Sequence, residues 1–169
     1  MAFDSTLSGT AANSYVDVAT ADAFFTLHLD GSYWTSLPTA TKQAALVQAT
    51  NRLDMEVFGG RPAIDGQRLQ WPRSFIVDRN QDYDDRVSVG GNYYISSTVQ
   101  PKELQDAVCE MALHLLKIKE GDFTVDENDL ETLQSYKVGP IDVTIKPNLK
   151  ADRLPSKVKS LLKAIGCLS

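Results

Sequence analysis

The hexapeptide Leu69-Gln70-Trp71-Pro72-Arg73-Ser74 is the stretch of this chain that says most about its fold. Trp71 supplies a large apolar ring system, and Pro72 removes an amide donor and favours an extended backbone at the residue before it. Arg73 adds a planar side chain with five hydrogen-bond donors. We predict that Trp71 closes a helical bundle between two flanking helices, with Pro72 setting the direction of the chain. Arg73 either binds loop carbonyl groups or reaches a neighbouring subunit.

Apolar residues recur with helical spacing on both sides of this hexapeptide. The pattern predicts four helices, at about residues 20–29, 39–57, 101–119 and 155–165. Thr20 is the expected cap of the first helix, and Leu29 belongs to its apolar face. Tyr33 and Trp34 are predicted to lie in a connector, and the small, polar residues 1–14 in a flexible lead-in.

Two short strand pairs are predicted in the remaining segments. Residues 86–89 and 93–96 alternate around Gly90-Gly91-Asn92, and residues 133–138 and 141–145 flank Gly139-Pro140. The predicted fold is therefore mainly α: a small helical bundle with a β-hairpin insertion at about 75–98, a C-terminal strand pair and a terminal helix. We expect a bundle domain at 1–146 and a basic arm at 147–169.

The composition is that of a soluble globular protein, with 43% apolar residues, 23% charged residues and a net charge of −5. Residues 1–41 hold four acids and no Lys or Arg, whereas from Lys146 onward there are six bases and one acid. An acidic body makes a poor general DNA binder, because neutralising phosphates supplies most non-specific affinity. Neither a membrane-spanning run nor a signal peptide is expected, so we predict synthesis in the cytoplasm.

The residue patterns of common active sites are missing from the sequence. His114 lies five residues after Cys109, so the two side chains point to different sides of one predicted helix. The polar loop that begins at Asp78 resembles a calcium loop, but Tyr83 stands where glycine is required and Val89 where glutamate is required. We therefore expect a protein that is not an enzyme and has no catalytic residues, cofactor or metal site.

Tyr93 and Tyr94 lie on the predicted hairpin and could stack on the bases of single-stranded DNA. However, the nearest bases, Arg79 and Arg86, lie among four aspartates, and such surroundings repel phosphate. The alternative is that the two tyrosines contact a neighbouring subunit or a component of the tail.

Several motifs follow one another in a defined order, at residues 13–17, 21–25, 42–53, 69–74, 101–115 and 137–143. Together these motifs resemble the head-to-tail adaptor (connector) proteins of tailed phages, some of which carry the name DnaT-like single-stranded-DNA-binding protein. The resemblance covers about residues 13–145. The segment between Ser74 and Gln100 is longer than the family pattern, so its role cannot be carried over.

The resemblance implies a helical protomer that assembles into a homo-oligomeric ring, commonly dodecameric, at the head–tail junction of the virion. Such a ring lies under the portal protein, extends the DNA channel and joins the capsid to neck or tail proteins. Packaged DNA would pass through it without sequence-specific contact, and no membrane is involved. The alternative function is a single-stranded-DNA-binding accessory protein of phage replication.

The predicted last helix combines a basic side with an apolar one. We predict that it docks on the portal or on an adjacent acidic protomer. The alternative is that this helix packs on its own bundle. The residues concerned are Lys157, Lys159, Leu161, Leu162, Lys163 and Ile165.

Overall fold

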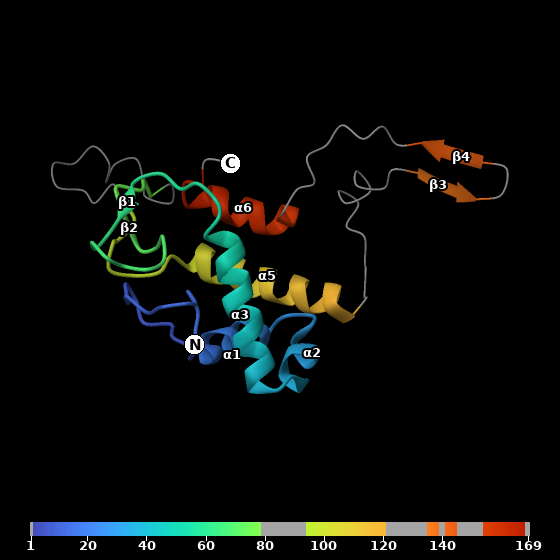
Figure 1. Ribbon diagram of the computed structural model, residues 1–169, viewed down its shortest axis with the longest axis horizontal. Helices are drawn as coiled ribbons and strands as arrows, with labels where there is room; N and C mark the ends of the chain where they lie inside the picture. Colours follow the sequence, from blue (N-terminus) through green and yellow to red (C-terminus); the bar gives the residue numbers. More distant parts are fainter. Residues whose placement is uncertain (1, 79–93, 121–134, 139–140, 145–153, 168–169) are drawn as a thin grey trace.

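The computed structural model describes residues 2–78, 94–120, 135–138, 141–144 and 154–167. The described chain is mainly helical (Figure 1), which confirms the predicted fold class. Its helices are α1 (Val18–Phe25), α2 (Gly31–Ser36), α3 (Thr39–Leu53), α5 (Lys102–Glu120) and α6 (Ser156–Ala164).

Helix α5 forms the centre of the bundle and packs against both α3 and α6. Its predicted apolar face is buried at Leu104, Val108 and Met111, each at most 1% exposed, whereas Ile118, which was predicted to continue this face, is 42% exposed. On α3, Leu46 and Leu53 are fully buried. The predicted extension of this helix to Val57 is wrong, because α3 ends at Leu53 and Val57 is exposed.

The first helix begins and ends earlier than predicted. Asp17, rather than Thr20, is its cap, and the Asp17 side chain accepts a hydrogen bond of 2.6 Å from the backbone N–H of Thr20. The predicted connector is helical as α2, because Trp34 is fully buried and stacks on Phe25 at 4.4 Å between ring centroids. Leu29 therefore lies between two helices and is fully exposed, not part of an apolar face.

The N-terminal segment is ordered, so the prediction of a flexible lead-in at residues 1–14 is wrong for the part that the structure describes. Asn13 is buried, and its side chain accepts a bond from the Asp4 N–H (2.9 Å) and donates one to the Ala2 carbonyl (2.7 Å). Ala12 and Tyr15 belong to the core. The segment looks polar in sequence, yet its polar groups satisfy one another and allow the neighbouring apolar side chains to be buried.

The Trp-Pro-Arg hexapeptide enters a small sheet that the sequence did not reveal. Strand β1 (Arg61–Pro62) pairs antiparallel with β2 (Arg73–Ser74), with Arg61 opposite Ser74. Gly60 precedes β1 with a φ of +65°, and a Cβ there would lie 2.2 Å from the Ser74 carbonyl oxygen. Only glycine allows so close an approach of the two backbones.

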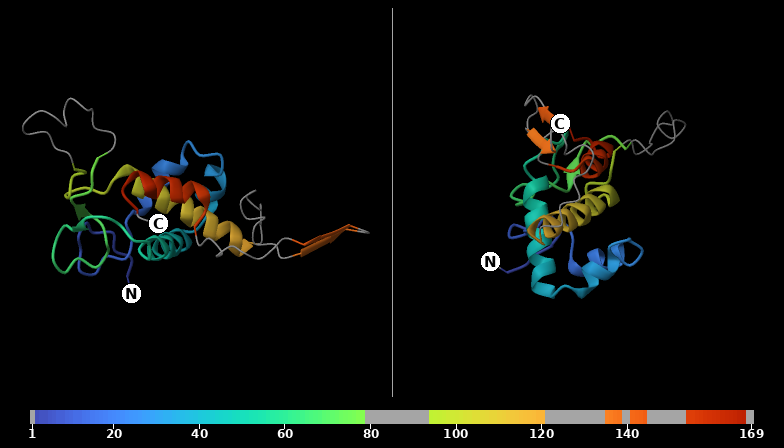
Figure 2. Two further views of the ribbon diagram at one scale, coloured as in Figure 1. Left: turned by 90° about the horizontal axis from the view of Figure 1, so that it is seen from above. Right: turned by 90° about the vertical axis from the view of Figure 1, so that its right-hand side faces the viewer.

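The predicted hairpin insertion falls mostly on residues 79–93, which lie outside the described part of the chain. Its two described ends are joined, because Val77 forms a β-bridge with Tyr94 and the Ile95 N–H donates to the Ile76 carbonyl at 2.8 Å. The predicted C-terminal strand pair is confirmed: β3 (Ser135–Val138) pairs antiparallel with β4 (Ile141–Thr144). Figures 1 and 2 show this pair clear of the helices.

The last helix packs on its own bundle, which was the alternative to docking on the portal or on an adjacent acidic protomer. Val158 and Leu162 of α6 are 1% exposed and face α5. Beyond the helix, the Gly59 N–H donates to the Gly166 carbonyl (3.1 Å), and Cys167 forms a β-bridge with Phe58. The end of the chain is thus attached to the loop after α3, while the predicted domain boundary at 146/147 lies outside the described residues.

Candidate functional site

Arg73 is buried, and its guanidinium group joins the loop after α3 to the hexapeptide. Its Nε donates to the Gly59 carbonyl at 2.6 Å, and its Nη2 donates to the carbonyls of Phe58 (3.3 Å) and Gly60 (3.1 Å). Its Nη1 donates to the carbonyl and side-chain oxygens of Gln70 at 3.3 and 3.2 Å. Only 6% of its surface is exposed, and Arg73 binds loop carbonyls, which was one of the two predicted roles.

Trp71 lies in the core at 1% exposure, with its ring edge-on to Phe58. The backbone N–H of Trp71 donates to the Tyr15 hydroxyl at 3.3 Å, and that hydroxyl donates to the Asp54 carboxylate. Asp54 also accepts from the Gln70 N–H at 3.0 Å. The hexapeptide therefore connects the N-terminal segment to the end of α3, and this buried arrangement leaves no ligand-facing surface on Trp71 or Arg73.

Burial raises the pKa of Tyr15 far above its ordinary value, and the negative charge of Asp54 raises it further. The hydroxyl consequently stays protonated and remains a donor to Asp54. This hydrogen bond stabilises the folded state and implies no acid–base chemistry.

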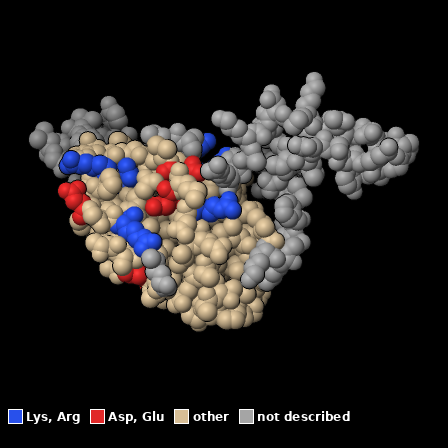
Figure 3. Space-filling model, viewed as in Figure 1, with Lys and Arg blue, Asp and Glu red and all other residues tan. Residues whose placement is uncertain are grey.

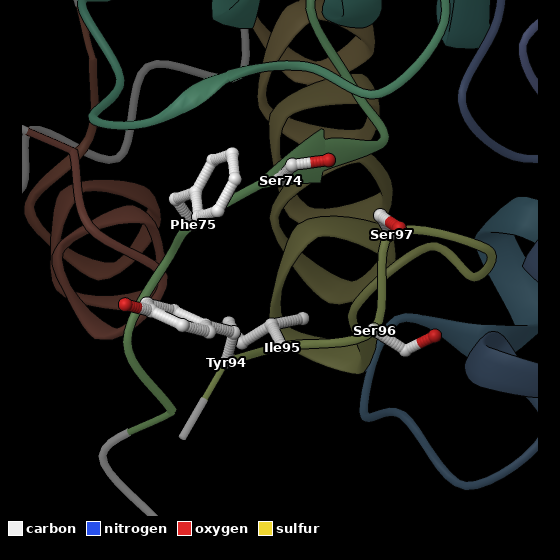
Figure 4. A pocket seen from close by; sticks show the side chains of 6 residues that line it. All are labelled: Ser74, Phe75, Tyr94, Ile95, Ser96 and Ser97. Carbon is white, nitrogen blue, oxygen red and sulfur yellow. The ribbon is translucent and has the colours of Figure 1, made fainter. Parts of the chain in front are cut away.

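A shallow hollow of about 300 Å³ lies beside β2 (Figure 4), and we call it the aromatic groove. The rings of Phe75 and Tyr94 occupy one side of it, edge to face, with centroids 5.6 Å apart. The guanidinium carbon of Arg61 lies 4.9 Å from the centre of the Phe75 ring, within cation–π range. The groove is lined by Ser74, Phe75, Tyr94, Ile95, Ser96 and Ser97.

Both aromatic side chains of the groove are accessible, with Phe75 54% and Tyr94 46% exposed. Phe75 adopts a φ of +66°, a conformation that bulky residues rarely take and that costs about 1–3 kcal/mol. The surrounding structure thus holds an apolar ring outward at an energetic cost, which points to a contact surface.

Of the two tyrosines predicted to make contacts, Tyr94 is in the groove and Tyr93 lies outside the described residues. Phe75 was not among the residues predicted to make a contact. The apolar run Phe75-Ile76-Val77 could have indicated this surface. Successive side chains of an extended segment point to opposite faces, so a run of three apolar residues leaves apolar side chains on the face turned away from the core. Here Ile76 is buried, whereas Phe75 and Val77 are exposed.

A second exposed apolar feature is the short connection between α1 and α2, residues 26–30, which we call the leucine loop. Leu27 is 96% exposed and Leu29 101% exposed. Behind the loop, His28 Nε2 lies 3.3 Å from a Glu110 carboxylate oxygen, and Lys117 Nζ lies 2.9 Å from Asp30. These pairs attach the loop to α5 rather than forming a reactive cluster.

The residues predicted to dock on a partner through α6 divide between two sides of the helix. Leu162 and Ile165 are each 1% exposed and pack inside the protomer, while Leu161 is half-buried. Lys157 is exposed and pairs with Glu110, and Lys163 is exposed. Lys159 is half-buried, so Lys157 and Lys163 are the predicted lysines with exposed side chains, and docking through this helix stays a prediction.

No cluster of three or more His, Cys, Asp or Glu side chains that could hold a metal ion occurs among the described residues. Within the same ranges, no helix has the length and apolar character needed to cross a membrane. The fold and surface define a small, mainly helical protein whose conspicuous exposed features are apolar patches.

The family model described as "Putative DnaT-like ssDNA binding protein" matches residues 3–167. The chain therefore belongs to this family, and the DnaT-like part of the resemblance is confirmed. No curated protein and no solved structure matches the chain. The adaptor part of the resemblance stays a prediction.

Proposed function

We propose that this protein is a structural, non-enzymatic head-to-tail adaptor of a tailed phage. It forms a homo-oligomeric ring under the portal, extends the DNA channel and joins the capsid to neck or tail proteins. The observation that carries this proposal is that exposed apolar side chains occur at several separate places, among them the leucine loop and the aromatic groove. Separate apolar patches of this kind suit a protomer that binds more than one neighbour at once.

The β3–β4 pair supports the same conclusion. A two-stranded hairpin is at best marginally stable in isolation, and its outer edges can pair with further strands. In the described ranges neither β3 nor β4 pairs with a third strand, and the pair lies clear of the helices (Figure 1). Strand addition from a portal, neck or neighbouring protomer would stabilise it.

Single-strand binding is the second candidate, because the aromatic groove combines exposed rings with Arg61. The charge distribution favours it less. On the face shown in Figure 3, the described Lys and Arg side chains are separated from one another and interspersed with acids, rather than forming a continuous basic track. The net charge of −5 also opposes phosphate binding.

Two measurements on the purified protein separate these functions. Native mass spectrometry with and without the portal protein should show a ring on the portal, and mass spectrometry of purified virions should detect the protein at ring stoichiometry. Fluorescence anisotropy with a labelled single strand at physiological salt should show weak binding. A monomer that binds the strand tightly and ignores the portal would reject the adaptor function.

A further inference from the structure

The imidazole ring of His28 attaches the leucine loop to the rest of the protomer. The ring stacks on Phe24 with centroids 5.7 Å apart and meets Phe25 edge-on with centroids 5.4 Å apart. Only 19% of the His28 side chain is exposed. These contacts hold the ring in place, so each of its two nitrogens has a definite polar neighbour.

The hydrogen bonds of His28 determine where its proton lies. Nδ1 accepts a hydrogen bond from the backbone N–H of Asp30 at 3.1 Å, and an accepting ring nitrogen carries a lone pair rather than a proton. The proton of the neutral ring therefore lies on Nε2, which is 3.3 Å from a carboxylate oxygen of Glu110. The folded loop thus selects one of the two neutral tautomers.

The charged groups around His28 come from the loop itself, from α5 and from α6. One carboxylate oxygen of Asp30 lies 3.8 Å from Nδ1, and the other lies 2.9 Å from Lys117 Nζ. Glu110, which is 12% exposed, pairs with Lys157 as well as with His28. Each ring nitrogen therefore has a carboxylate oxygen near it that can pair with a positively charged ring. The titratable side chains that line this pocket of about 310 Å³ beside His28 are Asp30, Glu110, His114, Lys117 and Lys157.

Uptake of a proton changes what Nδ1 can do. An imidazolium ring carries a hydrogen on both nitrogens, so Nδ1 becomes a donor and can no longer accept from the Asp30 N–H. Two N–H groups would then point at each other. The Asp30 carboxylate can accept the new hydrogen, but at 3.8 Å it is too far away until the turn moves.

We propose that His28 is a pH-sensitive switch of the leucine loop. Imidazole side chains change charge between about pH 5 and 8, and His28 takes its second proton from solvent onto Nδ1. The bond from the Asp30 N–H to Nδ1 is then exchanged for a bond from the Nδ1–H to the Asp30 carboxylate. Because Leu29 lies between His28 and Asp30 in the chain, the exchange moves this exposed leucine.

Nuclear magnetic resonance of the full chain tests the starting state. Long-range proton–nitrogen correlation spectra distinguish a ring nitrogen that carries a proton from one that carries a lone pair. At pH 8, His28 should carry its proton on Nε2 and its lone pair on Nδ1. His114→Asn removes the only other histidine of the chain and so assigns the signals. A proton on Nδ1 at pH 8 would overturn the proposal.

A titration of the wild type from pH 8 to 5 follows the switch itself. The backbone amide of Asp30, which loses its acceptor, and the methyl groups of Leu29 should shift with the same midpoint as the His28 ring. Resonances of Asp30 and Leu29 that do not follow the ring would contradict the switch. A midpoint that varies with protein concentration would assign the change to assembly and would likewise count against it.

His28→Asn separates the effect of the proton from that of the fold. The side-chain oxygen of asparagine can take the place of Nδ1 as acceptor for the Asp30 N–H, but asparagine does not titrate. The Asp30 amide should therefore keep its pH 8 resonance position down to pH 5. His114→Asn is the matched control, in which this amide should titrate as in the wild type.

The outcome of this comparison is decisive in either direction. If the Asp30 amide titrates equally in His28→Asn and in the wild type, the change belongs to another group of the pocket and His28 is not the switch. Circular dichroism establishes that both variants are folded. The wild-type tautomer and titration are decisive by themselves if a variant unfolds.

Discussion

Among single side chains, Arg73 and Tyr15 organise the region around the hexapeptide. Arg73 satisfies backbone carbonyls from the loop after α3, and Tyr15 joins the backbone N–H of Trp71 to the Asp54 carboxylate. Buried polar groups of this kind are costly when one partner is removed, because the other is left without a hydrogen bond. Both residues can be tested by conservative substitution.

Arg73→Lys should lower the free energy of unfolding by about 2–4 kcal/mol, because a lysine cannot supply the planar fork that spans several carbonyls. Urea unfolding followed by circular dichroism measures the change. Arg52→Lys, at an exposed position on α3, is the matched control and should change stability by less than about 0.5 kcal/mol. Equal stabilities of the two variants would contradict the role assigned to Arg73.

The raised pKa of Tyr15 makes the stability of the protein depend on alkaline pH. The unfolded tyrosine loses its proton near its ordinary value of about 10, whereas the folded one keeps it, so the stabilisation is complete below pH 10 and falls as the pH rises further. The slope should reach about 1.4 kcal/mol per pH unit from this residue.

Burial also raises the pKa of the Cys109 thiol, to about 12, and adds a similar loss that begins near pH 9. Tyr15→Phe separates the two effects because it removes only the first. Urea unfolding from pH 8 to 11 should give a shallower decline above pH 10 for Tyr15→Phe than for the wild type. If the two curves declined in parallel, the pKa of Tyr15 would be the same in the folded and unfolded states.

Among the elements, α6 combines an apolar side that packs in the bundle with a basic outer side. Its apolar side faces α5, and Lys157 and Lys163 remain on the outside. Deletion of residues 147–169 would therefore remove part of the core together with the basic surface. Point substitutions separate these two contributions.

Leu162→Ala should destabilise the protomer by about 2–5 kcal/mol, because it leaves a cavity against α5. Leu161→Ala is the matched control, since its half-buried neighbour on the same helix loses less packing. Thermal unfolding of both variants measures the difference. If the Leu162 variant were as stable as the wild type, α6 would not be an integral part of the bundle in solution.

For the complete protomer, the exposed lysines of α6 offer the surface for the proposed portal contact. Lys163→Ser should weaken portal binding roughly 1.4- to 5-fold, from about 0.2–1 kcal/mol for one exposed charge pair, and more strongly at low salt. Biolayer interferometry with immobilised portal measures the affinity. Lys102→Ser, whose side chain is 81% exposed on α5, should leave it unchanged, and an equal loss in both variants would refute docking through α6.

Local patterns in the sequence were sufficient for the mainly helical fold, for α5 and α6 as amphipathic helices and for the β3–β4 pair. Each depends on a periodicity or turn signal contained in the element itself. The burial of Trp71 could be anticipated for the same reason, because a large apolar ring next to a proline has few other roles. The ends of α1 and α3 were less predictable, because several residues within a few positions of each other can begin or end a helix.

Contacts between distant residues required the folded chain. Arg73 meets carbonyls 13 to 15 residues away, and Phe75 meets Tyr94 only because Val77 and Tyr94 form a bridge. The exposure of Leu27 and Leu29 likewise depends on where α1 ends and α2 begins. Helical periodicity indicates which face of a helix is apolar, but it carries no information about which loops contact each other in the folded chain.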